Sequence, residues 1–487
     1  SQNEQDNRNY AKFAKIPMLE PADSQEAKDF IKLAFELSER FDTPVFLRTT
    51  TRVSHSKSVV RTEERSPVAD RTDIRHLPLK YVMVPVNARA RRVEVETRMQ
   101  ALREWAETFP GNRVEMGSPE VGIITAGMPY NYARDAFPEY SYLKLGLVHP
   151  LPEKMIRDFA SRVKTLYVVE ELDPFIEEQV RAMGIEVSGK AVFPYTNEFD
   201  PGVIEKGVTG RSTAPAVTPP AIPPRPPNLC PGCPHRALFY ALGKTKAFVS
   251  GDIGCYTLSY MKPLSAMDSC ICMGASIGIA HGMSKALGPK GKGKVVGVIG
   301  DSTFIHSGIT TLLNAAYNRS DAVFIIADNR TTAMTGMQEH PATGYTLQGE
   351  KTRELDFASL GKVLGIDSVE VIDPLQYKNT TEVLKRELAK DGPSLIISRS
   401  PCVLLMSKKA DRAKPFFTDP DLCIGCKVCL SCGCPAISWK DFEKSGMPPR
   451  PERKKQKGIA VIDANLCTGC SLCAQLCRQE AIMREGA

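Results

Sequence analysis

The chain has 487 residues, several times the length of a common domain, so we expect more than one compact unit, each with its own core. Its 42% hydrophobic and 24% charged residues are typical of a globular protein, and it has no run of about 18 apolar residues, which excludes a membrane-spanning helix. The 63 basic residues are balanced by 56 acidic ones, so the formal charge of +7 indicates a mixed solvated surface and does not indicate a nucleic-acid-binding protein.

The first sixty residues have the pattern of one helix and one strand. Residues 24–40 begin with a capping residue and have helical periodicity, and residues 43–49 are predicted to form a strand. The apolar residues on one face of this helix are Phe30, Leu33, Ala34 and Leu37. One helix and one strand cannot form a stable α/β domain alone. We therefore expect residues 1–60 to be the end of a larger domain, and we do not expect Ser1 to be the natural start.

A small α/β domain and a linker are predicted next. Residues 120–127 (EVGIITAG) and 165–171 (TLYVVEE) are apolar, strand-like runs separated by helix-like stretches, a pattern typical of such a domain. We place the domain at residues 118–200. Residues 201–228 carry eight prolines, which predicts a semi-rigid linker.

After the linker, the pattern predicts one βαβ unit. The β-branched run at residues 294–304 is expected to be a buried parallel strand that delivers Asp301 to its end, and the run at 321–329 a second strand that delivers Asn329. The two side chains would then lie side by side as oxygen ligands suited to Mg²⁺ and to the phosphates that it holds. Between the strands, residues 307–318 are predicted to form a helix whose apolar face carries Ile309, Leu312, Leu313 and Ala316.

The spacing of these residues resembles the thiamine diphosphate motif, in which a Gly-Asp pair is followed at a set distance by Asn. Here Asn329 follows Asp301 by 28 positions. The resemblance implies that Mg²⁺ is bound by the side chains of Asp301 and Asn329 and by the backbone carbonyl of Thr331. A glycine lets the backbone approach a diphosphate closely, and two N–H groups at the helix start can donate to it. These three residues are Gly300, Ser302 and Thr303.

The cysteines are unevenly distributed, because the chain has 15 of them and none occurs before Cys230. An odd total, clustered in C-x-x-C units inside a large chain, favours metal clusters over disulfides and predicts a reducing compartment, the cytoplasm. Cys230 and Cys233 flank a Pro-Gly turn, which suits an iron–sulfur cluster or a zinc ion. Cys270 and Cys272 lie in a run of small residues and are interpreted as small buried residues outside any cluster.

The first cysteine pair, together with GDIGCY at residues 251–256, resembles the cofactor domain of 2-oxoacid:ferredoxin oxidoreductases. In that family such cysteines bind a 4Fe-4S cluster beside the thiamine cofactor. The resemblance implies Cys255 as the third ligand of this proximal cluster, and we choose Cys402 as the fourth. His281 and His306 neighbour the proposed cofactor and are candidates for polarising the substrate or relaying a proton, although a structural or surface role is the commoner one for either.

The C-terminal cysteines form two C-x-x-C-x-x-C motifs, in residues 421–435 and 465–482. They resemble a bacterial-type ferredoxin module with two 4Fe-4S clusters, in which the fourth cysteine of each motif binds the other cluster. One fourth ligand departs from the usual spacing, because Gly433 stands at the expected position between Cys432 and Cys434, and we choose Cys434 because a proline follows it. The implied ligands are Cys423, Cys426, Cys429 and Cys477 for ferredoxin cluster one, and Cys467, Cys470, Cys473 and Cys434 for ferredoxin cluster two.

The order of these pieces, and stretches such as CPGCPHR, GDIGCYTLS, MDSCICMGASIGIAHGM and DNRTTAMTG, resemble the alpha subunits of indolepyruvate:ferredoxin oxidoreductases over essentially the whole chain. The resemblance implies a multidomain α/β thiamine-enzyme fold with parallel sheets and a C-terminal two-cluster ferredoxin domain. It also implies thiamine-dependent oxidative decarboxylation of an arylpyruvate with coenzyme A, which gives CO₂ and an aryl-acetyl-CoA and passes electrons through the clusters to ferredoxin. A smaller partner subunit would complete the enzyme as a dimer of heterodimers.

The family's subunit starts with a pyrimidine-binding domain, of which we expect only the last part here. The glutamate that activates the aminopyrimidine is therefore assigned to no residue of this chain. The expected segments are 1–60, the end of the pyrimidine-binding domain; 61–117, a connecting segment; 118–200, a transketolase-C-terminal-like α/β domain; 201–228, the linker; 229–412, the thiamine diphosphate and magnesium domain with the proximal cluster; and 413–487, the ferredoxin domain.

Three alternative functions stay open from the sequence. An oxidoreductase for pyruvate or another 2-oxoacid would share the same motifs. A non-oxidative thiamine decarboxylase or synthase would explain Asp301 and Asn329 but would leave the eight ferredoxin cysteines without a role. An electron-transfer subunit with a vestigial thiamine domain would explain the cysteines but not the intact spacing of the magnesium motif.

Overall fold

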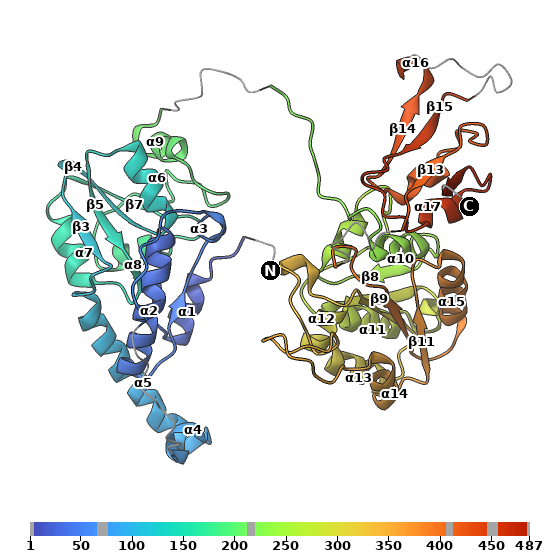
Figure 1. Cartoon of the computed structure of the whole chain (residues 1–487). Helices are drawn as coiled ribbons and strands as arrows, with labels where there is room; N and C mark the ends of the chain where they lie inside the picture. The colour runs from blue at the N-terminus through green and yellow to red at the C-terminus, as the bar shows by residue number, and fades with distance from the viewer. Residues whose placement is uncertain (1–3, 66–75, 212–219, 406–412, 446–455, 485–487) are drawn as a thin grey trace. The chain divides into compact units, whose positions relative to one another are not determined.

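The structure is a computed structural model that describes residues 4–65, 76–211, 220–405, 413–445 and 456–484. The chain forms two compact units, Gln2–Ala221 and Ile222–Ala487, and Figure 1 shows helices packed around a sheet in each. The main sheet of each unit is largely or wholly parallel, so the predicted α/β class is confirmed. Within the described ranges, no helix combines the length and the apolar character needed to cross a bilayer.

The first unit is built around a four-stranded sheet. Its elements are β3 (Arg113–Glu115), β4 (Ser118–Ala126), β5 (Tyr140–Leu145), β7 (Thr165–Val169) and the helices α6 (Met128–Ala136), α7 (Glu153–Ala160) and α8 (Phe175–Ala182). The strand order is β3-β5-β4-β7, with β4 parallel to β5 and β7 and with β3 antiparallel to β5. Ile124, Leu143 and Val168 from the three parallel strands lie in one core with α7 and α8.

The N-terminal segment packs against this domain. Its elements are α1 (Arg8–Ala14), β1 (Met18–Leu19), α2 (Ser24–Phe41), β2 (Phe46–Leu47) and α3 (Thr51–His55). Strand β1 pairs in parallel with β2 and antiparallel with β6 (Leu147–His149), so the segment is part of the same unit. The side chain of Asp23 caps α2 by accepting a hydrogen bond from the N–H of Glu26 at 2.8 Å. The predicted apolar face of this helix is confirmed: Phe30 and Leu37 are buried and the other two pack beside them.

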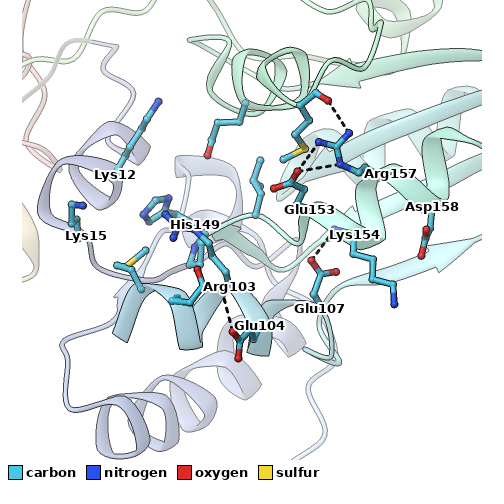
Figure 2. A pocket seen from close by; sticks show the side chains of 16 residues that line it. Lys12, Lys15, Arg103, Glu104, Glu107, His149, Glu153, Lys154, Arg157 and Asp158 are labelled. Carbon is cyan, nitrogen blue, oxygen red and sulfur yellow. Dashed lines mark hydrogen bonds and ion pairs between the residues drawn. The ribbon is translucent and has the colours of Figure 1, made fainter. Parts of the chain in front are cut away.

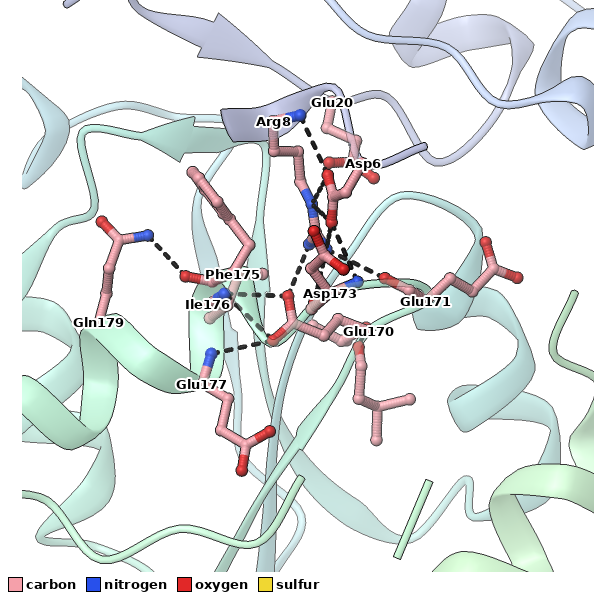
Figure 3. A network of polar contacts seen from close by, with 12 residues as sticks. Asp6, Arg8, Glu20, Glu170, Glu171, Asp173, Phe175, Ile176, Glu177 and Gln179 are labelled. Carbon is pink, nitrogen blue, oxygen red and sulfur yellow. Dashed lines mark hydrogen bonds and ion pairs between the residues drawn. The ribbon is translucent and has the colours of Figure 1, made fainter. Parts of the chain in front are cut away.

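A buried arginine holds the N-terminal segment to the loop after β7 (Figure 3). Arg8 is 2% exposed, and its guanidinium lies 2.6 Å from the carboxylate of Glu170 and donates to the carbonyl of Glu171 at 3.0 Å. The Glu170 carboxylate also accepts hydrogen bonds from the N–H groups of Ile176 and Glu177, both at 2.9 Å. A buried ion pair is tolerated only when hydrogen bonds saturate both partners, which is the case here.

Residues 61–117, expected to be a connecting segment, contain two helices, α4 (Pro78–Tyr81) and the 22-residue α5 (Pro85–Ala106). The last turns of α5 are buried through Met99, Leu102 and Ala106. Ala106 lies in one cluster with apolar residues of α2 and β6. This segment therefore contributes to the core of the first unit.

The predicted linker at residues 201–228 is wrong at its start, because Pro201–Thr209 forms helix α9. The side chain of Asp200 accepts a hydrogen bond from the N–H of Val203 at 2.8 Å, proline is favourable in the first turn, and Gly210 ends the helix at φ 69°. Ile204 is fully buried against apolar residues of the first unit. Residues 212–219 of the predicted linker lie outside the described residues.

The second unit is built around a five-stranded parallel sheet in the order β11-β12-β10-β9-β8. Its elements are β8 (Phe248–Ser250), β9 (Val295–Gly300), β10 (Val323–Asp328), β11 (Ser368–Ile372), β12 (Ser394–Arg399) and the helices α10 (Pro234–Leu242), α11 (Ala275–Leu287), α13 (Ile309–Tyr317), α14 (Phe357–Val363) and α15 (Tyr377–Ala389). The predicted βαβ unit is confirmed, since β9 and β10 are parallel neighbours joined by α13.

The helix of this βαβ unit differs from its prediction in two ways. It begins with the three residues Asp301–Thr303 (α12) and a π-helical turn, Phe304–Gly308 (η3), before α13 starts. The extra residue per turn rotates the helix, so Leu313 is 49% exposed whereas Ala315 is buried. Such π-helical turns are frequent at functional sites.

The C-terminal part of the second unit is small and rests on α10 and α15. It consists of two antiparallel strand pairs, β13 (Phe416–Thr418) with β16 (Ile482–Arg484) and β14 (Ile437–Asp441) with β15 (Gly458–Ile462), and of the short helices η6 (Val428–Cys432) and α17 (Leu472–Leu476). Ala237 and Tyr240 of α10 lie in one apolar cluster with Leu472 and Leu476. The side-chain amide of Gln475 also donates to the carbonyl of Leu375 at 2.7 Å.

Candidate functional site

The ends of β9 and β10 bring the predicted magnesium ligands together. Ala327 is paired with Gly300 across the two strands, so Asp301 and Asn329 follow at the same edge of the sheet. Asp301 is 3% exposed, and its carboxylate accepts hydrogen bonds from the N–H groups of Ser302 at 2.8 Å and Arg330 at 2.9 Å. The carboxylate is therefore fixed in place by the backbone of both loops.

Three polar groups converge here. The terminal amide of Asn329 lies 2.7 Å from the carbonyl oxygen of Thr331 and 3.3 Å from Oδ2 of Asp301. With its nitrogen at this position the amide donates to both oxygens, and rotation of the amide by 180° would present its own oxygen to a bound cation. Two neutral oxygens and one carboxylate are ligands that Mg²⁺ accepts. The donor set therefore fits the predicted ion.

Two histidines that the sequence did not single out also face this site. Nε2 of His340 lies 3.2 Å from Oδ2 of Asp301, and Nδ1 accepts a hydrogen bond from the N–H of Ala342 at 3.3 Å, so the ring proton sits on Nε2. Nε2 of His235 lies 3.3 Å from the side-chain nitrogen of Asn329. Burial lowers the pKa of His235 to about 4, against the opposing charge of Asp301, so this imidazole is neutral at physiological pH.

All six predicted cofactor-binding residues line the cavity next to these residues. Its lining includes His235, Ile253, Gly254, Cys255, Tyr256, Met273, Gly300, Asp301, Ser302, Thr303, Asn329 and Thr331. His281 and His306, the two histidines proposed from the sequence, are not in this lining. His281 is half-buried on α11, and His306 is exposed on the π-helical turn. The two histidines at the site are His235 and His340.

Gly300 also makes a close contact inside the protein. Its N–H donates to the hydroxyl of Tyr256 at 2.7 Å, and a Cβ at this position would lie 3.2 Å from the same ring. Glycine is therefore needed here for the close contact with Tyr256. The N–H of Ser302 already donates to Asp301, so a diphosphate would compete with that carboxylate for it.

A buried aspartate that the sequence analysis missed holds one wall of the cavity. Asp252 is fully buried, and its carboxylate accepts hydrogen bonds from the N–H groups of Ile253 at 2.8 Å, Gly274 at 2.9 Å and Ser276 at 3.2 Å. It thereby connects the loop that carries Cys255 with the start of α11.

The four predicted ligands of the proximal cluster lie within electrostatic reach of one another, although among the described residues no three such side chains are already assembled as a metal site. Burial raises the pKa of Cys233 to about 12, and negative charge on Cys230 and Cys402 would raise it further. Burial also raises the pKa of Cys255, again with contributions from Cys402 and Cys230. The N–H of Cys402 donates to the carbonyl of Asn329 at 2.9 Å, which joins this cysteine to the magnesium motif.

Cys270 and Cys272 lie outside the proximal set of cysteines. Cys272 is exposed and Cys270 is only half-buried, so their interpretation as small buried residues is wrong for Cys272. The run that contains them is held near Asp252 and is more open than its small side chains suggested.

The ferredoxin cysteines form two separate groups. One cavity is lined by Cys423, Cys426, Cys429 and Cys477, and another by Cys434, Cys467, Cys470 and Cys473, which are the two predicted ligand sets. Cys432 is not in the second lining. It is 1% exposed, its thiol donates to the carbonyl of Cys429 at 3.1 Å, and burial raises its pKa to about 11. These contacts favour Cys434 over Cys432 as a ligand.

A further cavity lies in the first unit, away from all predicted site residues (Figure 2). It has a volume of about 700 Å³, and Lys12, Lys15 and Arg103 gather around His149 on one side of it. His149 is 8% exposed, and neither of its ring nitrogens has a hydrogen-bond partner. Burial lowers the pKa of His149 to about 4, with smaller contributions from Arg103, Lys12 and Lys15.

This histidine predicts an acid-sensitive first unit. The unfolded chain takes up a proton at His149 near pH 6.5 and the folded unit only near pH 4, so stability is complete above pH 6.5 and is lost as the pH falls toward 4. We expect the loss to be about 3 kcal/mol, at about 1.4 kcal/mol per pH unit. Hydrogen exchange of peptides covering β6 should show it, and His149→Phe should remove it. As a control, substitution of the exposed His55 by Phe should leave the acid response unchanged. An identical acid response in wild type and His149→Phe would contradict the prediction.

Comparisons with known proteins agree with this geometry. Residues 252–398 match the family described as "Thiamine pyrophosphate enzyme, C-terminal TPP binding domain", and residues 460–483 match the family "4Fe-4S binding domain". The chain is 39% identical to indolepyruvate oxidoreductase subunit IorA of Archaeoglobus fulgidus, over 99% of this chain and 79% of that protein. It is 38% identical to the subunits of the same name from Methanothermobacter thermautotrophicus and Pyrococcus abyssi, over 100% of this chain and 80% of each of those proteins.

Proposed function

The chain belongs to the family of indolepyruvate oxidoreductase IorA subunits, which are thiamine diphosphate enzymes with an iron–sulfur domain, and from this premise we propose that it oxidatively decarboxylates arylpyruvates. Coenzyme A would accept the acyl group as a thioester, and an external ferredoxin would accept the electrons. The convergence of the Asp301 carboxylate, the Asn329 amide and the Thr331 carbonyl beside a cavity that Cys255 also lines is the observation that carries the proposal.

The residues of the chain have distinct roles in this proposal. Asp301, Asn329 and Thr331 would hold Mg²⁺, and the ion would supply positive charge for the diphosphate of the cofactor. When bound, thiamine diphosphate supplies the electron sink for decarboxylation. Neutral His235 lies beside the side chain of Asn329, and Nε2 of His340 lies 3.2 Å from Oδ2 of Asp301, so both imidazoles contact the metal ligands.

The positions of the cysteines support an order for electron transfer. Pro231 and Gly232, which separate Cys230 from Cys233, line the cavity of ferredoxin cluster two. A Cβ at Gly232 would collide with Thr468 in the second ferredoxin motif, so the two loops are in contact. We infer that electrons pass from the proximal cluster to ferredoxin cluster two and then to ferredoxin cluster one. A smaller subunit would complete the enzyme, since the relatives are named as subunits.

The test is an anaerobic assay of the enzyme purified with its partner subunit. Coenzyme A-dependent reduction of ferredoxin or a viologen is measured with indolepyruvate, phenylpyruvate and pyruvate, and iron is counted per chain. We expect turnover selective for the arylpyruvates and about twelve irons, four for each of three clusters. Selective turnover of pyruvate would contradict the proposed substrate. About eight irons per chain would contradict the proximal cluster. Release of an aldehyde without reduction of an acceptor would show that the reaction is non-oxidative.

A further inference from the structure

Arg236, on the first turn of α10, is a buried cation without a carboxylate partner. It is 2% exposed, its guanidinium donates to the carbonyl of Cys432 at 2.9 Å and to the side-chain oxygen of Asn228 at 3.2 Å, and it also donates to the carbonyl of Leu229. Its Nε has no hydrogen-bond partner. Among the described residues, no acidic side chain forms an ion pair with it. These partners are all neutral, so nothing in the described part of the chain compensates its charge.

The guanidinium lies between two cysteine sets. One partner, Leu229, precedes Cys230 of the proximal set, and another, Cys432, precedes the loop that delivers Cys434 to ferredoxin cluster two. Gly433 lies against it: this residue has φ 67°, and a Cβ there would lie 2.8 Å from the ring of Pro263 and 3.3 Å from Nη1 of Arg236. The glycine in the unusual Cys-Gly-Cys spacing of the first ferredoxin motif therefore leaves room for both Pro263 and the arginine.

The residues that accept hydrogen bonds from Arg236 lie beside two cysteine sets. Asn228 and Leu229 lie just before Cys230, and Cys432 lies just before the Gly433–Cys434 loop. None of these acceptors directly adjoins a ligand of ferredoxin cluster one. An isolated charge is costly to bury, so a nearby anion must offset that of Arg236 when the protein is loaded.

We propose that Arg236 is the shared counter-ion of the proximal cluster and ferredoxin cluster two, and that its charge raises the reduction potentials of both. The inference rests on the proposed cluster ligands. Each cluster accepts one electron without making or breaking a bond, and its charge becomes more negative by one. A fixed cation beside two clusters stabilises the reduced state of each. An electron that moves from one cluster to the other therefore stays close to the same positive charge. Ferredoxin cluster one lacks this stabilisation.

The test compares Arg236→Gln with Arg236→Lys in the anaerobically purified, iron-loaded enzyme. Reduction potentials are measured by a redox titration monitored by electron paramagnetic resonance, and iron is counted in each sample. Arg236→Gln should shift the oxidised-to-reduced ratio of the proximal cluster and of ferredoxin cluster two by about tenfold toward the oxidised state, or about 59 mV for one electron. Ferredoxin cluster one should not shift in either variant, and Arg236→Lys should shift the other two clusters less than Arg236→Gln does.

Lys244→Gln is the matched control, because it removes an exposed positive charge just after the same helix. It should leave all three potentials unchanged. Unchanged potentials in Arg236→Gln with full iron would overturn the proposal, as would a shift confined to one cluster or an equal shift of all three. If Arg236→Gln loses iron, Arg236→Lys decides: retained iron and near-normal potentials support the counter-ion role, and loss of iron there too overturns it. A wild-type protein with fewer than three clusters would instead contradict the proposed function.

Discussion

Asp301→Asn is expected to abolish most binding of thiamine diphosphate and, with it, turnover. The substitution keeps the shape of the side chain but removes the only carboxylate among the three converging polar groups, so Mg²⁺ loses its charged ligand. Loss of one partner of a buried charge pair costs about 2–5 kcal/mol, which corresponds to a loss of affinity of roughly 30-fold to several thousandfold. Calorimetric titration of the enzyme with thiamine diphosphate at fixed Mg²⁺ measures the affinity directly.

Asp391→Asn is the control for this prediction. Asp391 has an 87% exposed side chain and pairs with Lys292 on the surface of the same unit, where an ion pair contributes little. Its substitution should leave cofactor affinity and activity unchanged. Raising the Mg²⁺ concentration should partly restore binding in Asp301→Asn if the defect lies in the metal. Normal affinity of this variant at low Mg²⁺ would show that Asp301 is not a ligand.

Cys434→Ser and Cys432→Ser are expected to give opposite results, although only Gly433 separates the two cysteines. Cys434 lines the same cavity as Cys467, Cys470 and Cys473, so its loss should remove ferredoxin cluster two and lower the iron content from about twelve to about eight per chain. Cys432 donates a hydrogen bond from a protonated thiol to a carbonyl, and serine can make the same bond. The iron content of the Cys432→Ser variant should therefore equal that of the wild type.

Cys402→Ser extends this comparison to the proximal cluster. We expect it to remove those four irons and to leave the signals of the two ferredoxin clusters intact, because its neighbours are Cys230, Cys233 and Cys255. Iron analysis and electron paramagnetic resonance of the reduced proteins distinguish the variants. Loss of iron in Cys432→Ser with full iron in Cys434→Ser would reverse the assignment of the fourth ligand.

The neighbouring positions of the residues in the proposed magnesium motif could be predicted from the sequence, because one βαβ unit positions them. A β-branched run that is buried on both faces forms a parallel strand, and the βαβ connection places the ends of β9 and β10 at the same edge. Asp301 and Asn329 were therefore predictable as neighbours, and so were the cysteines within each C-x-x-C unit. Helix α9 was not predicted, because the many prolines of residues 201–228 indicated a linker and outweighed the signals of the capping Asp200 and the apolar Ile204.

By itself, the sequence predicted the α/β class, the cysteine motifs and the neighbouring positions of Asp301 and Asn329, because these follow from residue types at short, regular spacings. Only the tertiary structure decided which distant residues complete each site. His340 reaches Asp301 and Arg236 reaches Cys432 across the chain, and no periodicity connects those positions. The reason is physical: spacing along a strand or a tight loop sets local geometry, whereas burial and the pairing of charges depend on how separate segments pack together.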